Sequence, residues 1–272
     1  MYIAQTIRQR FDRVGGHEVV PWRPPGRDGV MTGRAFFGAT EVGGIRAILK
    51  VANPVRVEHV VDLRREIDIL AGRRTIGIVR AIDDGEVTLP LIGGGQVGCP
   101  FIVLQRLDTD LESALRCGKL QDWSAVRATL LSVADALNSL HVEGIIHGDL
   151  KPDNILMSEL GDVVLADFGS SRQLGDDELE PRFPPHFTEF QPVDTFYTTA
   201  VDVYGFGVLI HTLCFDQPFV QWRFGAAPAA RIRDQLASVA SQAIESLRDN
   251  LIKPDPADRP NMEEVMGCLA AI

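Results

Sequence analysis

Two short polar segments whose key aspartates lie 18 residues apart constrain this chain more than any other feature of its sequence. The first is His147-Gly148-Asp149-Leu150-Lys151-Pro152-Asp153-Asn154-Ile155-Leu156, and the second is Ala166-Asp167-Phe168-Gly169. Each overlaps a short apolar run, so its polar side chains are predicted to lie on loops just after short strands. A carboxylate and an amide oxygen suit a hard divalent cation such as Mg²⁺. A second carboxylate can orient or deprotonate a hydroxyl, and the Lys151 ammonium can neutralise charge on a transferred phosphoryl group.

The order of predicted elements favours an α+β fold in two lobes. Runs of β-branched or aromatic residues predict strands at Arg34–Glu41, Ile45–Ala52, Ile78–Ile82 and Phe101–Gln105, with loop at Pro21–Gly33 and a Gly-rich hairpin excursion at Asp83–Pro100. Apolar residues at three- and four-residue steps predict a helix at Asp122–Val142, and a nearly all-apolar run predicts a buried helix at Thr199–Phe215. Further helices are predicted at Val57–Ala71, which Gly72 could cap, and from Ala229 to Lys253. We therefore expect a small β-rich lobe with one main helix at residues 1–104, which begins with an extension at 1–20, and a larger helical lobe at 105–272.

Composition excludes several classes of protein. With 45% hydrophobic and 24% charged residues, the chain can bury a sizeable core. The net charge of −10 argues against a nucleic-acid partner. No run of 18 apolar residues and no apolar leader is present, so we expect no membrane partner. The four cysteines lie far apart and indicate reduced thiols in a cytoplasmic protein, or in one that a dedicated machine delivers into a host cell.

Lysine is scarce in this sequence. Of the 27 basic residues only four are lysines, namely Lys50, Lys119, Lys151 and Lys253. Such an arginine bias is typical of a GC-rich, bacterial coding composition. A lysine that survives in it indicates a site that needs a compact ammonium group instead of a guanidinium group.

The two polar segments resemble the catalytic loop and the D-F-G motif of the protein kinase superfamily, in the same order and spacing. Upstream, the segment 47–50 (Ala-Ile-Leu-Lys) resembles the strand that carries the phosphate-holding lysine of that superfamily. Glu66 follows Lys50 by 16 residues, inside a predicted helix, where the superfamily places the glutamate that pairs with this lysine. Two of the four lysines therefore fall at the two kinase lysine positions.

Downstream motifs extend the resemblance over residues 26–270, as one kinase domain. The segment 202–208, which begins with Asp202, resembles the start of the buried helix of the C-terminal lobe. In that superfamily this aspartate binds the backbone of the catalytic loop. The segment 255–260 resembles the late R-P motif, whose arginine, here Arg259, usually pairs with a glutamate of the activation segment, for which Glu189 is the candidate.

The resemblance implies a two-lobed kinase-like fold, a serine/threonine protein kinase activity, ATP and Mg²⁺ as cofactors, and a protein substrate with a Ser or Thr acceptor. Lysine two positions after the catalytic aspartate is the Ser/Thr pattern. The implied catalytic residues are Asp149, Lys151, Lys50 and Glu66, and the implied metal ligands are Asn154 and Asp167. The implied nucleotide-binding residues are Gly29, Gly33, Ile48, Lys50, Leu104, Gln105 and Leu156.

The sequence departs from the superfamily pattern at three places. The Gly-rich loop is degenerate over residues 25–33, and Ile48 replaces the usual alanine against the adenine. Gly148 replaces the arginine of the usual H-R-D, which normally binds a phosphate on the activation loop. We therefore expect an enzyme that is always active or is switched in another way. His147 is expected to pack in the core beneath Phe168.

Two alternative functions stay open at this point. A small-molecule phosphotransferase of the aminoglycoside-kinase type also uses H-G-D, but Lys151, the D-F-G motif, the Asp202 helix and Arg259 are of protein-kinase type. A pseudokinase that binds partners without phosphoryl transfer is favoured by the degenerate loop and by Ile48. The complete set of Lys50, Glu66, Asp149, Asn154 and Asp167 opposes it.

Overall fold

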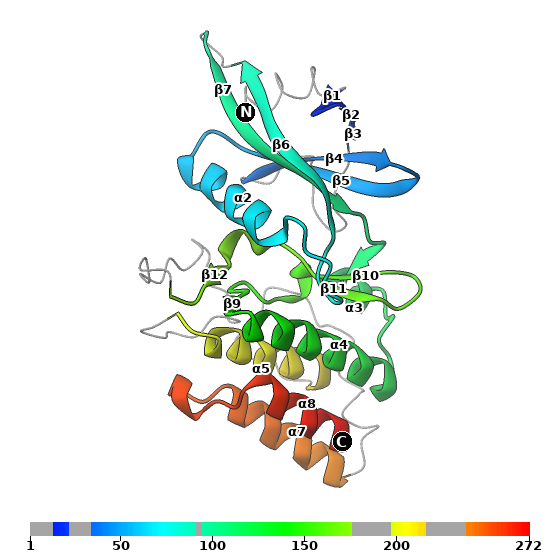
Figure 1. Cartoon of the computed structure of the whole chain (residues 1–272). Coiled ribbons are helices and arrows are strands. Elements are labelled where there is room, and N and C mark those ends of the chain that lie inside the picture. The colour runs from blue at the N-terminus through cyan, green and yellow to red at the C-terminus, as the bar shows by residue number, and fades with distance from the viewer. Residues whose placement is uncertain (1–12, 22–33, 91–93, 176–196, 216–237) are drawn as a thin grey trace. The chain divides into compact units, whose positions relative to one another are not determined.

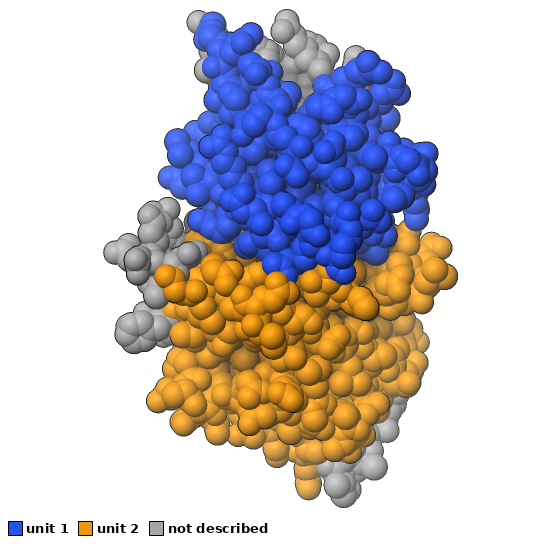
Figure 2. Space-filling view, viewed as in Figure 1, with its two compact units in different colours: residues 1–74, 79–107 blue, residues 75–78, 108–272 orange. Residues whose placement is uncertain are grey.

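The computed structural model describes residues 13–21, 34–90, 94–175, 197–215 and 238–272, to which this account is confined. The chain divides into two compact units, residues 1–74 with 79–107 and residues 75–78 with 108–272 (Figure 2). The predicted phosphate-loop residues Gly29 and Gly33, and the candidate ion-pair partner Glu189, lie outside the described residues.

An antiparallel sheet of five strands forms the body of the first unit (Figure 1). Its strand order is β3 (Val20–Pro21), β4 (Ala35–Val42), β5 (Ile45–Ala52), β7 (Gln96–Gln105) and β6 (Ala81–Pro90). A two-stranded hairpin of β1 (Arg13–Val14) and β2 (His17–Glu18) accompanies it. The predicted turn between β4 and β5 is confirmed, because Val42 pairs with Ile45 across Gly43 and Gly44, which have φ values of +57° and +80°.

One face of β5 packs in the hydrophobic core of the first unit, and the other face carries two of the predicted site residues. Residues alternate between the faces of a strand, so Leu49 and Val51 enter the hydrophobic core that Phe36 and Phe101 share. Lys50 and Ile48 lie at the alternate positions, on the opposite face. The helix α2 (Val57–Leu70) contacts β5, β6 and β7 and buries Leu63, Glu66 and Leu70.

The hairpin excursion predicted at Asp83–Pro100 is largely regular strand. β6 and β7 pair from Ala81 opposite Leu104 to Pro90 opposite Gln96, with one irregularity between Ala81 and Asp83. Glycine in this segment serves close packing, because a Cβ at Gly85 would lie 3.0 Å from the ring of Phe101. The predicted hairpin is therefore confirmed, and its strands run further than the short strands predicted at Ile78–Ile82 and Phe101–Gln105.

The second unit consists of helices and short strands (Figure 1). The helices are α3 (Leu111–Arg116), α4 (Trp123–Val142), α5 (Ala200–Cys214), α7 (Ser238–Leu251) and α8 (Met262–Ala271). The strands β8 (Thr109–Asp110), β10 (Ile155–Met157) and β11 (Val163–Leu165) form one sheet, and β9 (Ile145–Ile146) pairs with β12 (Arg172–Gln173). α4 contacts β9, β11, α5 and α8, and thereby supports the loops that follow β9 and β11.

Helix α5 forms the centre of this unit and confirms the expectation of a buried helix. Phe206, Val208, Leu209 and Ile210 are fully buried, and Asp202 near its first turn is 1% exposed. Among the described residues, no helix has the length and apolar character needed to cross a membrane.

We expect the start of α4 to depend on its N-cap. The Asp122 side chain accepts a hydrogen bond from the backbone N–H of Ala125 at 2.8 Å. Replacing Asp122 by Ala leaves this N–H without its acceptor and is expected to lower the free energy of unfolding by about 1 kcal/mol. Urea unfolding followed by circular dichroism measures the change. Asp122→Asn retains a capping oxygen and should lose much less, and equal losses in the two variants would contradict the capping role.

Candidate active site

Lys50 and Glu66 form a close ion pair in the first unit. The Lys50 Nζ donates to the Glu66 Oε2 at 2.6 Å, and the two side chains are 13% and 1% exposed. The pair links the sheet to α2, because Lys50 lies on β5 and Glu66 on the buried face of the helix. A buried carboxylate needs such a partner, and the lysine is in turn held in one position.

Three of the predicted nucleotide-binding residues lie on two neighbouring strands of the first unit. Ile48 pairs with Leu104 and Ala47 pairs with Gln105 across β5 and β7. Ile48 and Leu104 are 8% and 9% exposed, and Gln105 is exposed. Leu156 is also a predicted nucleotide-binding residue, but it belongs to the second unit. It lies on β10 and pairs with Asp110 of β8 on one side and with Val164 of β11 on the other.

The loop after β9 brings three predicted site residues together in the second unit. The Lys151 Nζ lies 2.6 Å from the Asp149 Oδ2. The Asn154 Nδ2 donates to the backbone oxygen of Asp149 at 2.8 Å and to its Oδ2 at 3.0 Å. The Asp149 side chain is 5% exposed, so its carboxylate is fixed by two donors in a largely dry environment. An oriented carboxylate of this kind suits a group that must accept or direct a hydroxyl proton.

Asp167 adjoins this loop through the backbone. The N–H of Ala166 donates to the oxygen of Asn154 at 2.9 Å, which places the residue before Asp167 beside the asparagine. Asp167 has a φ of 63°, and it is the only described residue other than glycine with a positive φ. Non-glycine residues adopt this conformation at a cost and are enriched at functional sites.

The turn after Asp167 packs on His147, as expected. The rings of His147 and Phe168 meet edge to face with centroids 4.9 Å apart, and both residues are fully buried. The His147 Nδ1 accepts from the N–H of Asp149, and its Nε2 lies 3.1 Å from the oxygen of Ala166. Contacts at both of its ring nitrogens therefore let the imidazole join the two loops.

The donor set of Asn154 and Asp167 fits the Mg²⁺ ion that the resemblance implies. The Asn154 Nδ2 is directed to Asp149, so the amide oxygen is the atom that would serve as a ligand. Asp167 would supply the carboxylate, and the residue before it is hydrogen-bonded to Asn154 through the backbone. One amide oxygen and one carboxylate suit Mg²⁺, which retains waters and takes phosphate oxygens in addition. Within the described part of the chain, no cluster of three or more His, Cys, Asp or Glu side chains could hold a metal ion by itself.

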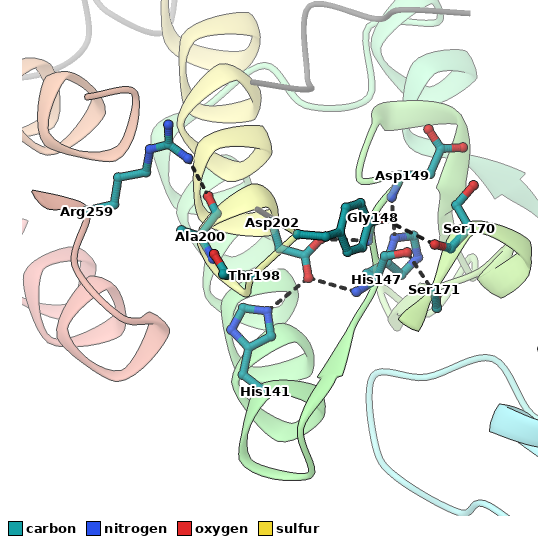
Figure 3. A network of polar contacts seen from close by, with 11 residues as sticks. His141, His147, Gly148, Asp149, Ser170, Ser171, Thr198, Ala200, Asp202 and Arg259 are labelled. Carbon is teal, nitrogen blue, oxygen red and sulfur yellow. Dashed lines mark hydrogen bonds and ion pairs between the residues drawn. The ribbon is translucent and has the colours of Figure 1, made fainter. Parts of the chain in front are cut away.

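A second buried carboxylate, that of Asp202, holds the backbone of the first loop (Figure 3). Its Oδ2 accepts from the N–H of His147 at 2.8 Å and from the His141 Nε2 at 2.9 Å, and its Oδ1 accepts from the N–H of Gly148 at 2.8 Å. Burial raises the pKa of Asp202, but the hydrogen bonds from His141 and Gly148 and the nearby His147 lower it, and the net pKa is below its ordinary value. The carboxylate is therefore ionised, as its three donors require.

Arg259 contacts the start of α5. Its Nη1 donates to the oxygen of Ala200 at 2.9 Å, its Nε donates to the oxygen of Lys253 at 2.8 Å, and its guanidinium lies over the Tyr204 ring. The late R-P motif thus fastens the segment before α8 to the helix that carries Asp202.

Sequence reasoning missed an acidic group beside the loop. Burial raises the pKa of Glu112 to about 8, and the hydrogen bond and negative charge of Asp153 and the charge of Asp110 add to the shift, while Arg116 opposes it. Glu112 lies on α3, whose six residues are too few to show periodicity, so the sequence carried no signal for this proximity.

Comparisons with known proteins agree with these motifs. The family model described as "Protein kinase domain" matches residues 39–268. Serine/threonine-protein kinase PkaA of Streptomyces coelicolor is 32% identical over 168 residues, which are 54% of this chain and 30% of that protein. Serine/threonine-protein kinase PknK of Mycobacterium tuberculosis is 30% identical over 191 residues, which are 64% of this chain and 17% of that protein. Cyclin-dependent kinase G1 of Arabidopsis thaliana is 30% identical over 161 residues, or 57% and 25%, so the chain spans less than a third of each relative.

We expect Asp202→Asn to destabilise the protein strongly near neutral pH. The substitution removes a buried charge with three donors, at an expected cost of about 2–4 kcal/mol in the free energy of unfolding. Because the folded-state pKa of Asp202 is lowered, its stabilisation is complete above the ordinary aspartate pKa of about 4 and declines as the pH falls through the folded-state value. Urea unfolding at several pH values should show the gap to wild type narrowing toward acid pH. Asp84→Asn, at an exposed site, is the control, and a gap that does not change with pH would contradict the assignment.

We expect Glu112 to give the opposite pH dependence. Its raised pKa means that the folded protein keeps a proton that the unfolded chain loses above about pH 4.3, so stability falls as the pH rises toward 8. Glu112→Gln cannot ionise and should melt about 2–4 °C above wild type at pH 8, with little difference at pH 5. Thermal unfolding at both pH values measures this, with the exposed Glu159→Gln as control. A variant that melts below wild type at pH 8 would show that the carboxylate is ionised and stabilising.

Proposed function

Because this chain belongs to the protein kinase family, we propose that it transfers the γ-phosphoryl group of ATP, with Mg²⁺, to Ser or Thr hydroxyls of protein substrates. The observation that carries the proposal is the group formed by Asp149, Lys151 and Asn154, in which two donors fix one carboxylate. Family membership supports the use of ATP, and Lys151 two positions after Asp149 supports Ser and Thr as acceptors.

Each residue then has a defined part in the reaction. Asp149 orients the acceptor hydroxyl and takes its proton as the oxygen bonds to the γ-phosphorus. The bond from this phosphorus to the oxygen that bridges the β- and γ-phosphates breaks, and ADP leaves. Lys151 lies beside Asp149 and stabilises the negative charge of the transferred group.

The remaining predicted residues bind the nucleotide and the metal. Lys50, held by Glu66, binds the α- and β-phosphates, and Asn154 with Asp167 binds Mg²⁺. Ile48, Leu104 and Gln105 on the sheet, and Leu156 on β10, contact the adenine, whereas Gly29 and Gly33 contribute backbone amides to the phosphates. We propose one kinase domain, with a lobe that ends at residue 104 and a second that begins at 105, three residues before the border of the compact units.

The same chemistry indicates the setting of the reaction. A kinase needs a compartment that supplies ATP, so we place this protein in the cytoplasm of its own cell or of a host cell. A net charge of −10 supports protein substrates over nucleic acid.

Transfer of radiolabelled γ-phosphate tests the proposal. We expect wild-type protein to label itself or a basic protein mixture on Ser or Thr. Asp149→Asn and Asp167→Asn should lower the rate by about 10²–10⁴-fold, because each loses a charge that the reaction needs. Asp162→Asn is the control, since Asp162 lies in the exposed turn between β10 and β11 and contacts Ser158.

Two other outcomes would overturn the proposal. Label on an aminoglycoside acceptor but on no protein would show a small-molecule phosphotransferase. No transfer to any acceptor, together with a melting temperature that does not respond to ATP and Mg²⁺, would show a pseudokinase.

A further inference from the structure

Gly148 and Tyr197 are matched in shape. Gly148 has a φ of +76°, and a Cβ at this position would overlap the Tyr197 hydroxyl and lie 2.7 Å from its Cζ and 3.0 Å from the oxygen of Ser170. Any other residue at position 148 would thus meet both backbone strain and the tyrosine. Tyr197 therefore occupies the space where the side chain of residue 148 would otherwise begin.

Tyr197 is held firmly at this point. It is 6% exposed and forms a small apolar cluster with Ile146 and Val201. Its hydroxyl donates to the backbone oxygen of Ser170 at 3.2 Å. A phenylalanine ring could fill the same apolar cluster, but it could not make the hydrogen bond to Ser170. The hydroxyl is therefore the part of the side chain that a substitution by phenylalanine tests.

The segment that Tyr197 contacts is joined to the catalytic loop by other bonds as well (Figure 3). The buried Ser171 hydroxyl donates to the oxygen of His147 at 2.8 Å, and Arg172 on β12 pairs with Ile146 on β9. The Nη1 of Arg172 also donates to the oxygen of Ser170, at 3.0 Å. Ser170 is therefore held from two sides, and Tyr197 provides the contact that covers Gly148.

We propose that Tyr197 is a positioning residue that sets the catalytic loop against the segment after Asp167. The inference rests on the proposed kinase function. Gly148 directly precedes Asp149, and Ser170 follows Asp167 by three residues. One hydroxyl therefore covers the residue before the first functional carboxylate and bonds to the backbone three residues after the second. Displacements of about 1 Å between reacting groups can cost about a hundredfold in rate, which makes such a contact effective although one hydrogen bond is weak.

Tyr197→Phe tests the hydroxyl while it keeps the ring. We expect kcat to fall about tenfold while the KM for ATP stays within about twofold, because the contact aligns Asp149 and Asp167 and holds no part of the nucleotide. Tyr204→Phe makes the same chemical change on α5, where the ring lies over Arg259, and should leave kcat unchanged. If Tyr197→Phe keeps the wild-type kcat, or if its KM for ATP rises in proportion, the positioning role is wrong.

Amide hydrogen exchange gives a readout that needs no activity. In Tyr197→Phe, peptides that cover residues 147–149 and 168–173 should exchange faster than in wild type, whereas peptides from α4 should not change. Unchanged exchange in both loops would overturn the proposal even in an inactive protein. An inactive wild type in which Tyr197→Phe does loosen both loops would refute the kinase function and leave the structural contact in place.

The fit between the two residues supplies a second test. Gly148→Ala places a Cβ against the Tyr197 hydroxyl, so the contact with Ser170 is expected to be lost in this variant already. Adding Tyr197→Phe to Gly148→Ala should then lower kcat by less than twofold, against about tenfold in the wild-type background. Equal effects in the two backgrounds would show that Tyr197 acts independently of Gly148 and would contradict the proposal. Thermal unfolding of each variant identifies one that fails to fold. If Gly148→Ala does not fold, the hydrogen-exchange measurement on Tyr197→Phe alone tests the positioning role.

Discussion

The Asp202 carboxylate accepts three hydrogen bonds inside the second unit, and two of them come from consecutive backbone N–H groups of His147 and Gly148. A charge buried to 1% exposure is tolerated only when donors of this kind surround it. The carboxylate holds the backbone of the loop, and the N–H groups of the loop help to keep the carboxylate ionised. The orientation of Asp149, which follows directly in sequence, therefore depends on a side chain that touches neither nucleotide nor substrate in the proposed reaction.

The contacts within the candidate site could be predicted because the residues that make them are close in sequence. Asp149, Lys151 and Asn154 lie within six residues of one another, and the structure joins them through the bonds that their charges and amide favour. Lys50 and Glu66 are 16 residues apart, and the strand and the helix that carry them were each predicted from the sequence. The Asn261 capping box at the start of α8 is a comparable local signal, since its Glu264 lies three residues on.

The features that could not be predicted depend on contacts between distant residues. Gly85 lies within β6, where a Cβ would lie 3.0 Å from the Phe101 ring, and the glycine by itself gives no sign of this contact. Tyr197 lies 49 residues after Gly148, and neither residue type by itself indicates the other. The absence of the arginine expected at position 148 was visible, but which side chain fills that space is decided by packing in three dimensions.

The exchange of arginine for glycine at position 148 changes the kind of force that holds the loop. An arginine that binds a phosphate acts through charge, so its effect varies with phosphorylation and is screened by salt. The Tyr197 hydroxyl and the Ser170 oxygen are uncharged, and Tyr197 is 6% exposed, so their contact depends on shape and on one neutral hydrogen bond. In the proposed kinase, the contact between Tyr197 and Ser170 beside Asp149 is then set by folding itself and does not depend on a phosphate bound at position 148.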